Sequence, residues 1–195
     1  MRIILAGFLG GIAMFVWTSI AHIALPLGQT GFSQIPGEAT VLASMHHAIG
    51  DGAGLYFFPW TDMRHSNAMA EEAAKLKVNP SGLLIYRPPG SDGMTATTLL
   101  VEFGKEFVVS LIAAFLLART VLFSYVARVG FVTLVGLGAT LTTNVSYWNW
   151  YGFPASYTLA AMITDLVGYF VAGLAIAAIL GRSRTYRSMN QPVTA

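Results

Sequence analysis

Residues 3–25 read IILAGFLGGIAMFVWTSIAHIAL, an apolar run in which only Thr18, Ser19 and His22 are polar. At about 1.5 Å of helix per residue, the run covers the roughly 30 Å hydrocarbon core of a bilayer. The apolar region of a signal peptide is shorter, about 7 to 15 residues, and ends at a small-residue cleavage site that this run matches poorly. We therefore interpret residues 1–25 as a first transmembrane helix that is not cleaved.

Two glycines in this run, Gly7 and Gly11, lie four residues apart on the same face of the predicted helix. Small residues at this spacing let a neighbouring helix approach closely. They predict the face of the first helix against which another helix packs.

The composition of the whole chain is that of a membrane protein. Of the 195 residues, 55% are hydrophobic and only 10% are charged, whereas soluble domains carry about 25% charged residues. The absence of cysteine excludes disulfide scaffolds, cysteine zinc sites and thiol chemistry. The net charge is +2, but no nucleic-acid-binding motif accompanies it, so nucleic acid is not an expected partner.

A polar stretch, residues 26–96, interrupts the apolar sequence and predicts a small α/β cap. Its expected elements are a helix at 36–49, a strand at 55–60, a helix at 66–77 and a strand at 82–86. Proline at a first helical turn and a Glu–Lys pair four residues apart favour the helices, and glycine and proline bound the strands. A domain of this size buries little core alone, so we expect it to lean on the membrane helices or on a partner.

Three further transmembrane helices are predicted in residues 97–181, at 99–118, 129–145 and 155–180. The first of them carries Glu102, Lys105 and Glu106, and the apolar run that remains without these positions is too short to span. The fold class is therefore an all-α polytopic membrane protein with four transmembrane helices and one small cap between the first two. Residues 182–195 are a polar tail.

The basic residues outside the polar stretch predict the orientation. Apart from Lys105, within a predicted helix, they are Arg2, Arg119, Arg128, Arg182, Arg184 and Arg187, and these all fall on one side of the predicted helices, where no acidic residue lies. Positive charge accumulates on the cytoplasmic side of membrane proteins. Both termini are therefore expected in the cytoplasm and the cap outside it, in what we interpret as a bacterial inner membrane.

Polar side chains of all four predicted helices lie at similar heights when residues are counted from these arginines at about 1.5 Å each. The layer comprises Asp165, Glu102, Glu106, Lys105, His22 and Asn144. Ionisable groups that face lipid are costly, so they normally turn inward and pair. The layer predicts a pocket for a cation, a proton or a polar headgroup. The alternative is a hydrated outer boundary that only fixes helix packing.

The cap histidines His46, His47 and His65 are weak candidates for metal ligands. Adjacent histidines on a helix point about 100° apart, and the sequence has no HxxxH or HExxH pattern. We predict no metal site there and no particular cofactor. No catalytic motif supports an enzyme.

The function that we expect is that of an accessory or assembly subunit of a larger membrane protein complex. The cap and the helix faces would contact the bilayer and other subunits, or further copies of the chain. An alternative is a small cation- or proton-coupled transporter or channel-like protein that uses the outer carboxylate layer. A third interpretation is an enzyme acting on an apolar substrate, with the same carboxylates and His22 as acid and base.

Overall fold

The computed structural model describes residues 1–181 and is mostly helical. The described chain divides into two compact units. The helical unit comprises Met1–Gly31, Met94–Ser146 and residues 154–181, and the cap unit comprises Phe32–Gly93 and Tyr147–Phe153. The predicted tail, with Arg182, Arg184 and Arg187, lies outside the described residues.

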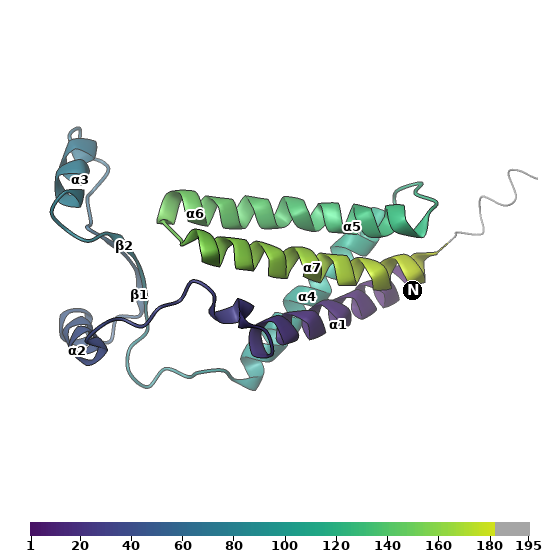
Figure 1. Cartoon of the computed structure of the whole chain (residues 1–195), viewed down its shortest axis with the longest axis horizontal. Helices are drawn as coiled ribbons and strands as arrows, with labels where there is room; N and C mark the ends of the chain where they lie inside the picture. The colour runs from purple at the N-terminus through teal and green to yellow at the C-terminus, as the bar shows by residue number, and fades with distance from the viewer. Residues whose placement is uncertain (182–195) are drawn as a thin grey trace, which may run out of the picture. The chain divides into compact units, whose positions relative to one another are not determined.

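Long apolar helices build the helical unit (Figure 1). They are α1 (Arg2–Ile23), α4 (Ala96–Leu117), α5 (Tyr125–Thr140) and α7 (Ala155–Leu180), and the short 3-10 helix η1 (Pro26–Gln29) follows α1. A π-helical turn, η2 (Leu141–Val145), and α6 (Ser146–Tyr151) continue α5 without a break. The third predicted span therefore extends further in both directions than the expected residues 129–145.

Three of these helical segments are long and apolar enough to cross a membrane, namely Arg2–Ile23, Tyr125–Tyr151 and Ala155–Leu180. They confirm the predicted first, third and fourth apolar segments and are consistent with a multi-pass membrane protein. The predicted second segment is helical as well, because it forms α4. Because α4 carries three charged residues, it is not one of the three segments apolar enough to cross a membrane.

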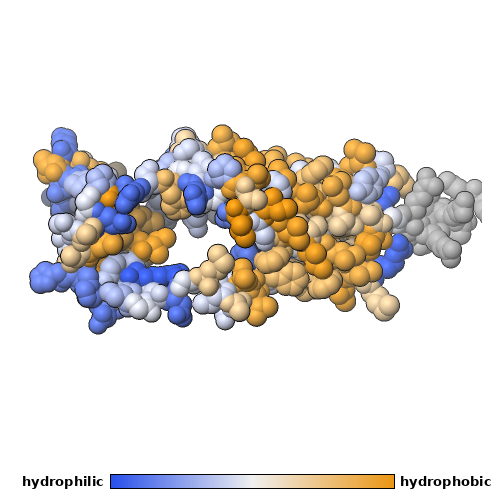
Figure 2. Space-filling view, turned by 60° about the horizontal axis from the view of Figure 1, so that its bottom comes forward, coloured by the Kyte–Doolittle hydropathy of each residue, from blue (hydrophilic) through white to orange (hydrophobic). Residues whose placement is uncertain are grey.

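By their contacts, the helices of the helical unit form a row in the order α4, α1, α7, α5, and α4 makes few contacts with α5 or α7. Helices α1 and α7 therefore lie in the middle of the row. Small residues and a few larger ones form the core, which consists of Ala6, Met14, Ala113, Ala114, Leu117, Val132, Ala172 and Ile176. Hydrophobic side chains cover much of the outside of this unit (Figure 2).

The two glycines of α1 face α4, which confirms their predicted role. A Cβ atom added to Gly7 would lie 2.7 Å from the Cα of Leu111, and one added to Gly11 would lie 2.8 Å from the Cα of Phe107. Real Cβ atoms do not approach other backbones so closely. The absence of side chains at these positions therefore sets the distance between α1 and α4.

The cap unit contains α2 (Glu38–Ile49), β1 (Gly54–Phe58), α3 (Ala68–Leu76) and β2 (Gly82–Tyr86). All four elements were predicted, within about two residues at each end. The strands pair antiparallel, with Gly54 opposite Tyr86 and Phe58 opposite Gly82. Left-handed glycines flank α2, because Gly37 (φ 68°) precedes its first turn and Gly50 (φ 67°) follows its last.

The cap unit has almost no core. Thr61, Ala68 and Tyr86 are the buried residues among its described positions. Every residue of β1 is exposed. Two paired strands are at best marginally stable in water without a covering layer, so this unit is short of buried apolar surface.

Candidate functional site

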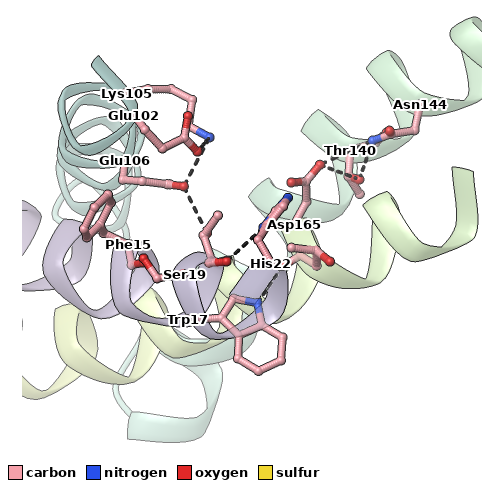
Figure 3. A network of polar contacts seen from close by, with 12 residues as sticks. Phe15, Trp17, Ser19, His22, Glu102, Lys105, Glu106, Thr140, Asn144 and Asp165 are labelled. Carbon is pink, nitrogen blue, oxygen red and sulfur yellow. Dashed lines mark hydrogen bonds and ion pairs between the residues drawn. The ribbon is translucent and has the colours of Figure 1, made fainter. Parts of the chain in front are cut away.

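Three charged side chains of α4 form a connected group on one face of the helix (Figure 3). The helix begins with a capping box, in which Thr95 and Thr98 satisfy each other's backbone N–H groups. From this start, Glu102, Lys105 and Glu106 fall at positions i, i+3 and i+4 and share a face. The ammonium of Lys105 lies 2.8 Å from Glu102 Oε1 and 3.1 Å from Glu106 Oε1.

Burial differs sharply within this group. The side chains of Lys105 and Glu102 are 52% and 39% exposed, whereas that of Glu106 is 1% exposed. The hydroxyl of Thr18, on α1, donates a hydrogen bond to Glu106 Oε1 over 3.2 Å. Glu106 therefore joins the charged face of α4 to the interior between α4 and α1.

Two oxygens in this interior have no hydrogen-bond partner among the described residues. They are Glu106 Oε2 and the hydroxyl oxygen of Ser110, which lies one helical turn further along α4 and is 1% exposed. Buried polar atoms are almost always hydrogen-bonded. Arg128 Nε and the Thr158 hydroxyl are likewise buried without a partner in the described part of this unit, but Glu106 is the carboxylate among these residues.

His22 lies near this group but does not contact the carboxylates. Its Nδ1 lies 2.9 Å from the backbone oxygen of Thr18, one turn earlier in α1, and the residue is exposed. A Cβ atom on Gly28 would lie 2.9 Å from the His22 ring, so the chain that follows α1 closes over one side of the imidazole.

Asp165 and Asn144 form a second network, between α7 and the π-helical turn that follows α5 (Figure 3). Asp165 Oδ2 accepts hydrogen bonds of 3.3 Å from Thr140 Oγ1 and from Asn144 Nδ2. The Asn144 amide also donates to the backbone oxygen of Thr140 over 3.0 Å. π-Helical turns are frequent at functional sites, and this one lies where Asn144 reaches Asp165.

The six predicted site residues thus fall into two networks. Glu102, Lys105 and Glu106 are held together on α4, with His22 linked through Thr18, and Asp165 is held with Asn144. No hydrogen bond or ion pair joins the two networks within residues 1–181. Tyr169, one turn after Asp165 on α7, packs against the core of the helical unit.

Several members of these networks were not predicted, namely Thr18, Ser110, Thr140 and Tyr169. Each lies one helical turn from a predicted residue, because Thr18 precedes His22, Ser110 follows Glu106, Thr140 precedes Asn144 and Tyr169 follows Asp165. Spacing by four residues was therefore the available signal. Threonine and serine are common in membrane helices, where their hydroxyls usually bond the preceding turn, so this signal was weak.

Two arginines bind the opposite end of α7. Arg2 Nη2 donates to the backbone oxygen of Ile179 over 2.9 Å. Arg128, which is 8% exposed, donates from Nη1 to Ala177 over 3.2 Å and from Nη2 to Phe123 over 2.7 Å. Guanidinium groups at a helix C-terminus satisfy free carbonyl groups and complement the helix dipole.

The cap histidines do not converge. His46 Nδ1 lies 3.4 Å from the Tyr86 hydroxyl, and His65 Nε2 lies 3.8 Å from Asp62 Oδ2. In the described part of the chain, no three His, Asp or Glu side chains are grouped as metal ligands. Asp62 instead pairs with Arg64 across 2.6 Å, and this guanidinium lowers the pKa of the Asp62 carboxyl.

Comparisons with known proteins add no further guide to this site. No protein family, no curated protein and no solved structure matches the chain significantly.

Proposed function

We propose that this chain is an integral membrane accessory or assembly subunit of a larger protein complex, and that the cap unit is its main contact surface. The observation that carries the proposal is the lack of a core in the cap unit, where Thr61, Ala68 and Tyr86 are the buried residues among those described. A free-standing domain of about 60 residues buries roughly 60% of the surface of its unfolded chain. A partner surface supplies the missing burial.

One face of the two-stranded sheet is the best contact point. Leu55 and Ile85 are directly opposed across the strands, and they are 65% and 70% exposed. Phe57 and Leu83 are paired two residues further along the same face. Trp60, just beyond β1, is 70% exposed. Exposed apolar patches that include aromatic residues are typical of protein interaction sites.

The proposed topology has α4 as a fourth span, both termini in the cytoplasm and the cap outside, in a bacterial inner membrane. The charged residues of α4 occupy one face of the helix, whereas Val101, Val108 and Ile112 elsewhere on it are 67%, 51% and 52% exposed. Such a helix can lie in lipid on its apolar side while Glu106 turns towards α1 and Lys105 pairs with both glutamates. The contacts of Arg2 and Arg128 with the last turn of α7 support a common cytoplasmic end.

Affinity purification tests the proposed subunit role. A tagged chain extracted gently from native membranes is expected to carry defined partner proteins, identified by mass spectrometry. Ile85→Asp is expected to release them, because it places a charge in the proposed contact face. Val78→Asp is the matched control, since Val78 is 80% exposed in the same unit but lies outside the sheet. Purification of the unmodified chain alone would contradict the proposal.

Cysteine labelling tests the topology independently, since the chain has no cysteine of its own. Ser91→Cys lies before α4, and Val121→Cys lies between α4 and α5. A membrane-impermeant maleimide added to intact cells is expected to label Ser91→Cys at once and Val121→Cys after permeabilisation. Equal labelling of both positions in intact cells would show that α4 does not cross the membrane.

A further inference from the structure

We propose that Glu106 is a proton-binding carboxyl group built into the contact between α1 and α4, with Lys105 as its counter-ion. This inference goes beyond the subunit role, because it assigns a ligand to the interior of the helical unit and does not depend on the cap. It rests on the hydrogen bonding of the Glu106 carboxylate, in which one oxygen has partners and the other has none among the described residues.

All contacts of this carboxylate are on one oxygen. Glu106 Oε1 accepts from Lys105 Nζ at 3.1 Å and from Thr18 Oγ1 at 3.2 Å. Oε2 is buried and has no partner among the described residues. An ionised carboxylate has about four acceptor sites, and leaving a buried charged oxygen without a donor is costly.

The facing part of α1 leaves no room for a donor side chain. A Cβ atom on Gly11 would lie 3.3 Å from the carbonyl carbon of Glu106, and one on Gly10 would lie 3.3 Å from the Cβ of Ser110. Glycine has no side-chain donor, and the α1 backbone N–H groups are used within the helix. The hydroxyl of Thr18 is therefore the donor that α1 supplies to this carboxylate among the described residues.

A proton fits these constraints better than a metal ion. The ammonium of Lys105 at 3.1 Å would repel a second cation at the same carboxylate. Within residues 1–181, no group of three carboxylates or histidines is present to bind a metal. A proton on Oε2 forms an O–H bond, removes the negative charge and converts the unpaired acceptor into a donor. Oε1, which would become the carbonyl oxygen, keeps its hydrogen bonds from Lys105 and Thr18.

The charged and titratable groups around Glu106 come from three helices. Glu102 and Lys105 are on α4 itself, His22 is on α1, and Asp165 and Tyr169 are on α7. Lys105 and Thr18 bind Glu106 Oε1, and Glu102 places a second carboxylate on the same Lys105 ammonium. Binding takes one proton from water at the exposed side of the Lys105 group, and release returns it, with no change in oxidation state.

Infrared difference spectroscopy of the purified full chain in lipid nanodiscs tests this assignment. As the pH is lowered, the unmodified protein is expected to develop the C=O stretching band of a buried, protonated carboxyl group. The band is expected to disappear in Glu106→Gln and to persist in Glu102→Gln and Asp165→Asn, which serve as matched controls. A band that persists in Glu106→Gln, or that is absent from the unmodified protein, would overturn the proposal.

A second variant tests the same geometry without touching the carboxylate. Thr18→Val removes the hydroxyl that donates to Glu106 Oε1 and is expected to shift the Glu106 band to higher frequency, because the carbonyl oxygen of the protonated group loses a hydrogen bond. An unchanged band position would contradict the role given to Thr18 and the site built with it. Partner retention in the affinity purification is measured on the same variants, so failure of the proton site and failure of the subunit role are separate results.

Discussion

Gly11→Ala is the sharpest test of how α1 and α4 pack. The added Cβ would lie 2.8 Å from Phe107 Cα, and the other nearest atoms, Phe107 N and Glu106 C, also belong to the backbone. Non-bonded carbon atoms are most stable about 3.5–4.0 Å apart. The two helices must therefore separate by about 0.7–1.2 Å, since no flexible side chain can move aside.

The expected cost of this change is about 1–3 kcal/mol in the free energy of unfolding, the usual range for overpacking a well-packed interior. The separation would also lengthen the 3.2 Å bond between Thr18 and Glu106 beyond hydrogen-bonding distance. Reversible unfolding in mixed detergent micelles, followed by circular dichroism, measures this free energy.

Gly104→Ala is the matched control, because Gly104 lies on α4 and an added Cβ would meet nothing within 4 Å. This substitution is expected to be neutral or to stabilise the helix by up to about 1 kcal/mol, since alanine loses less backbone entropy than glycine on folding. Equal stability of Gly11→Ala and Gly104→Ala would refute the close backbone contact.

Three further predictions concern charged groups. Arg128→Met is expected to lower the free energy of unfolding by about 1.5–3 kcal/mol, since it removes charged hydrogen bonds to Ala177 and Phe123. Unfolding in micelles measures this loss against Arg119→Met, a control at an exposed arginine. Lys105→Met is expected to cost about 1–2 kcal/mol by the same assay, and Glu106→Gln in the same chain should restore part of it; additive losses would contradict the pairing. The ion pair with Arg64 holds the pKa of the Asp62 carboxyl in the folded protein below the ordinary value of 3.8. The contribution of this pair to stability is therefore present above pH 3.8 and is lost as the pH falls through the folded-state pKa. Asp62→Asn should flatten this acid dependence of the melting temperature, and an unchanged dependence would contradict the ion pair.

The two polar networks show why height along a helix does not define a site. Glu102 and Asp165 were predicted at similar heights, because each lies 17 residues before an arginine. They belong to α4 and α7, which are separated in the row by α1.

The local structure was largely determined by the sequence. Apolar runs of sufficient length predicted α1 and α7, and glycine and proline bounded the strands of the cap, because backbone preferences and the thickness of a bilayer act on short segments. The shared face of Glu102, Lys105 and Glu106 also followed from helical periodicity alone. The spacing of Gly7 and Gly11 indicated a contact face but not the helix that occupies it.

Tertiary structure alone decided which polar atoms are buried and which are paired. Glu102 and Glu106 are chemically alike and lie four residues apart, yet the Glu102 side chain is 39% exposed and that of Glu106 is buried and bonded to Thr18 of α1. The physical reason is that periodicity fixes the angle of a side chain about its own helix but not the order in which helices pack. That order, α4 beside α1 and α1 beside α7, left Glu106 Oε2 buried without a donor.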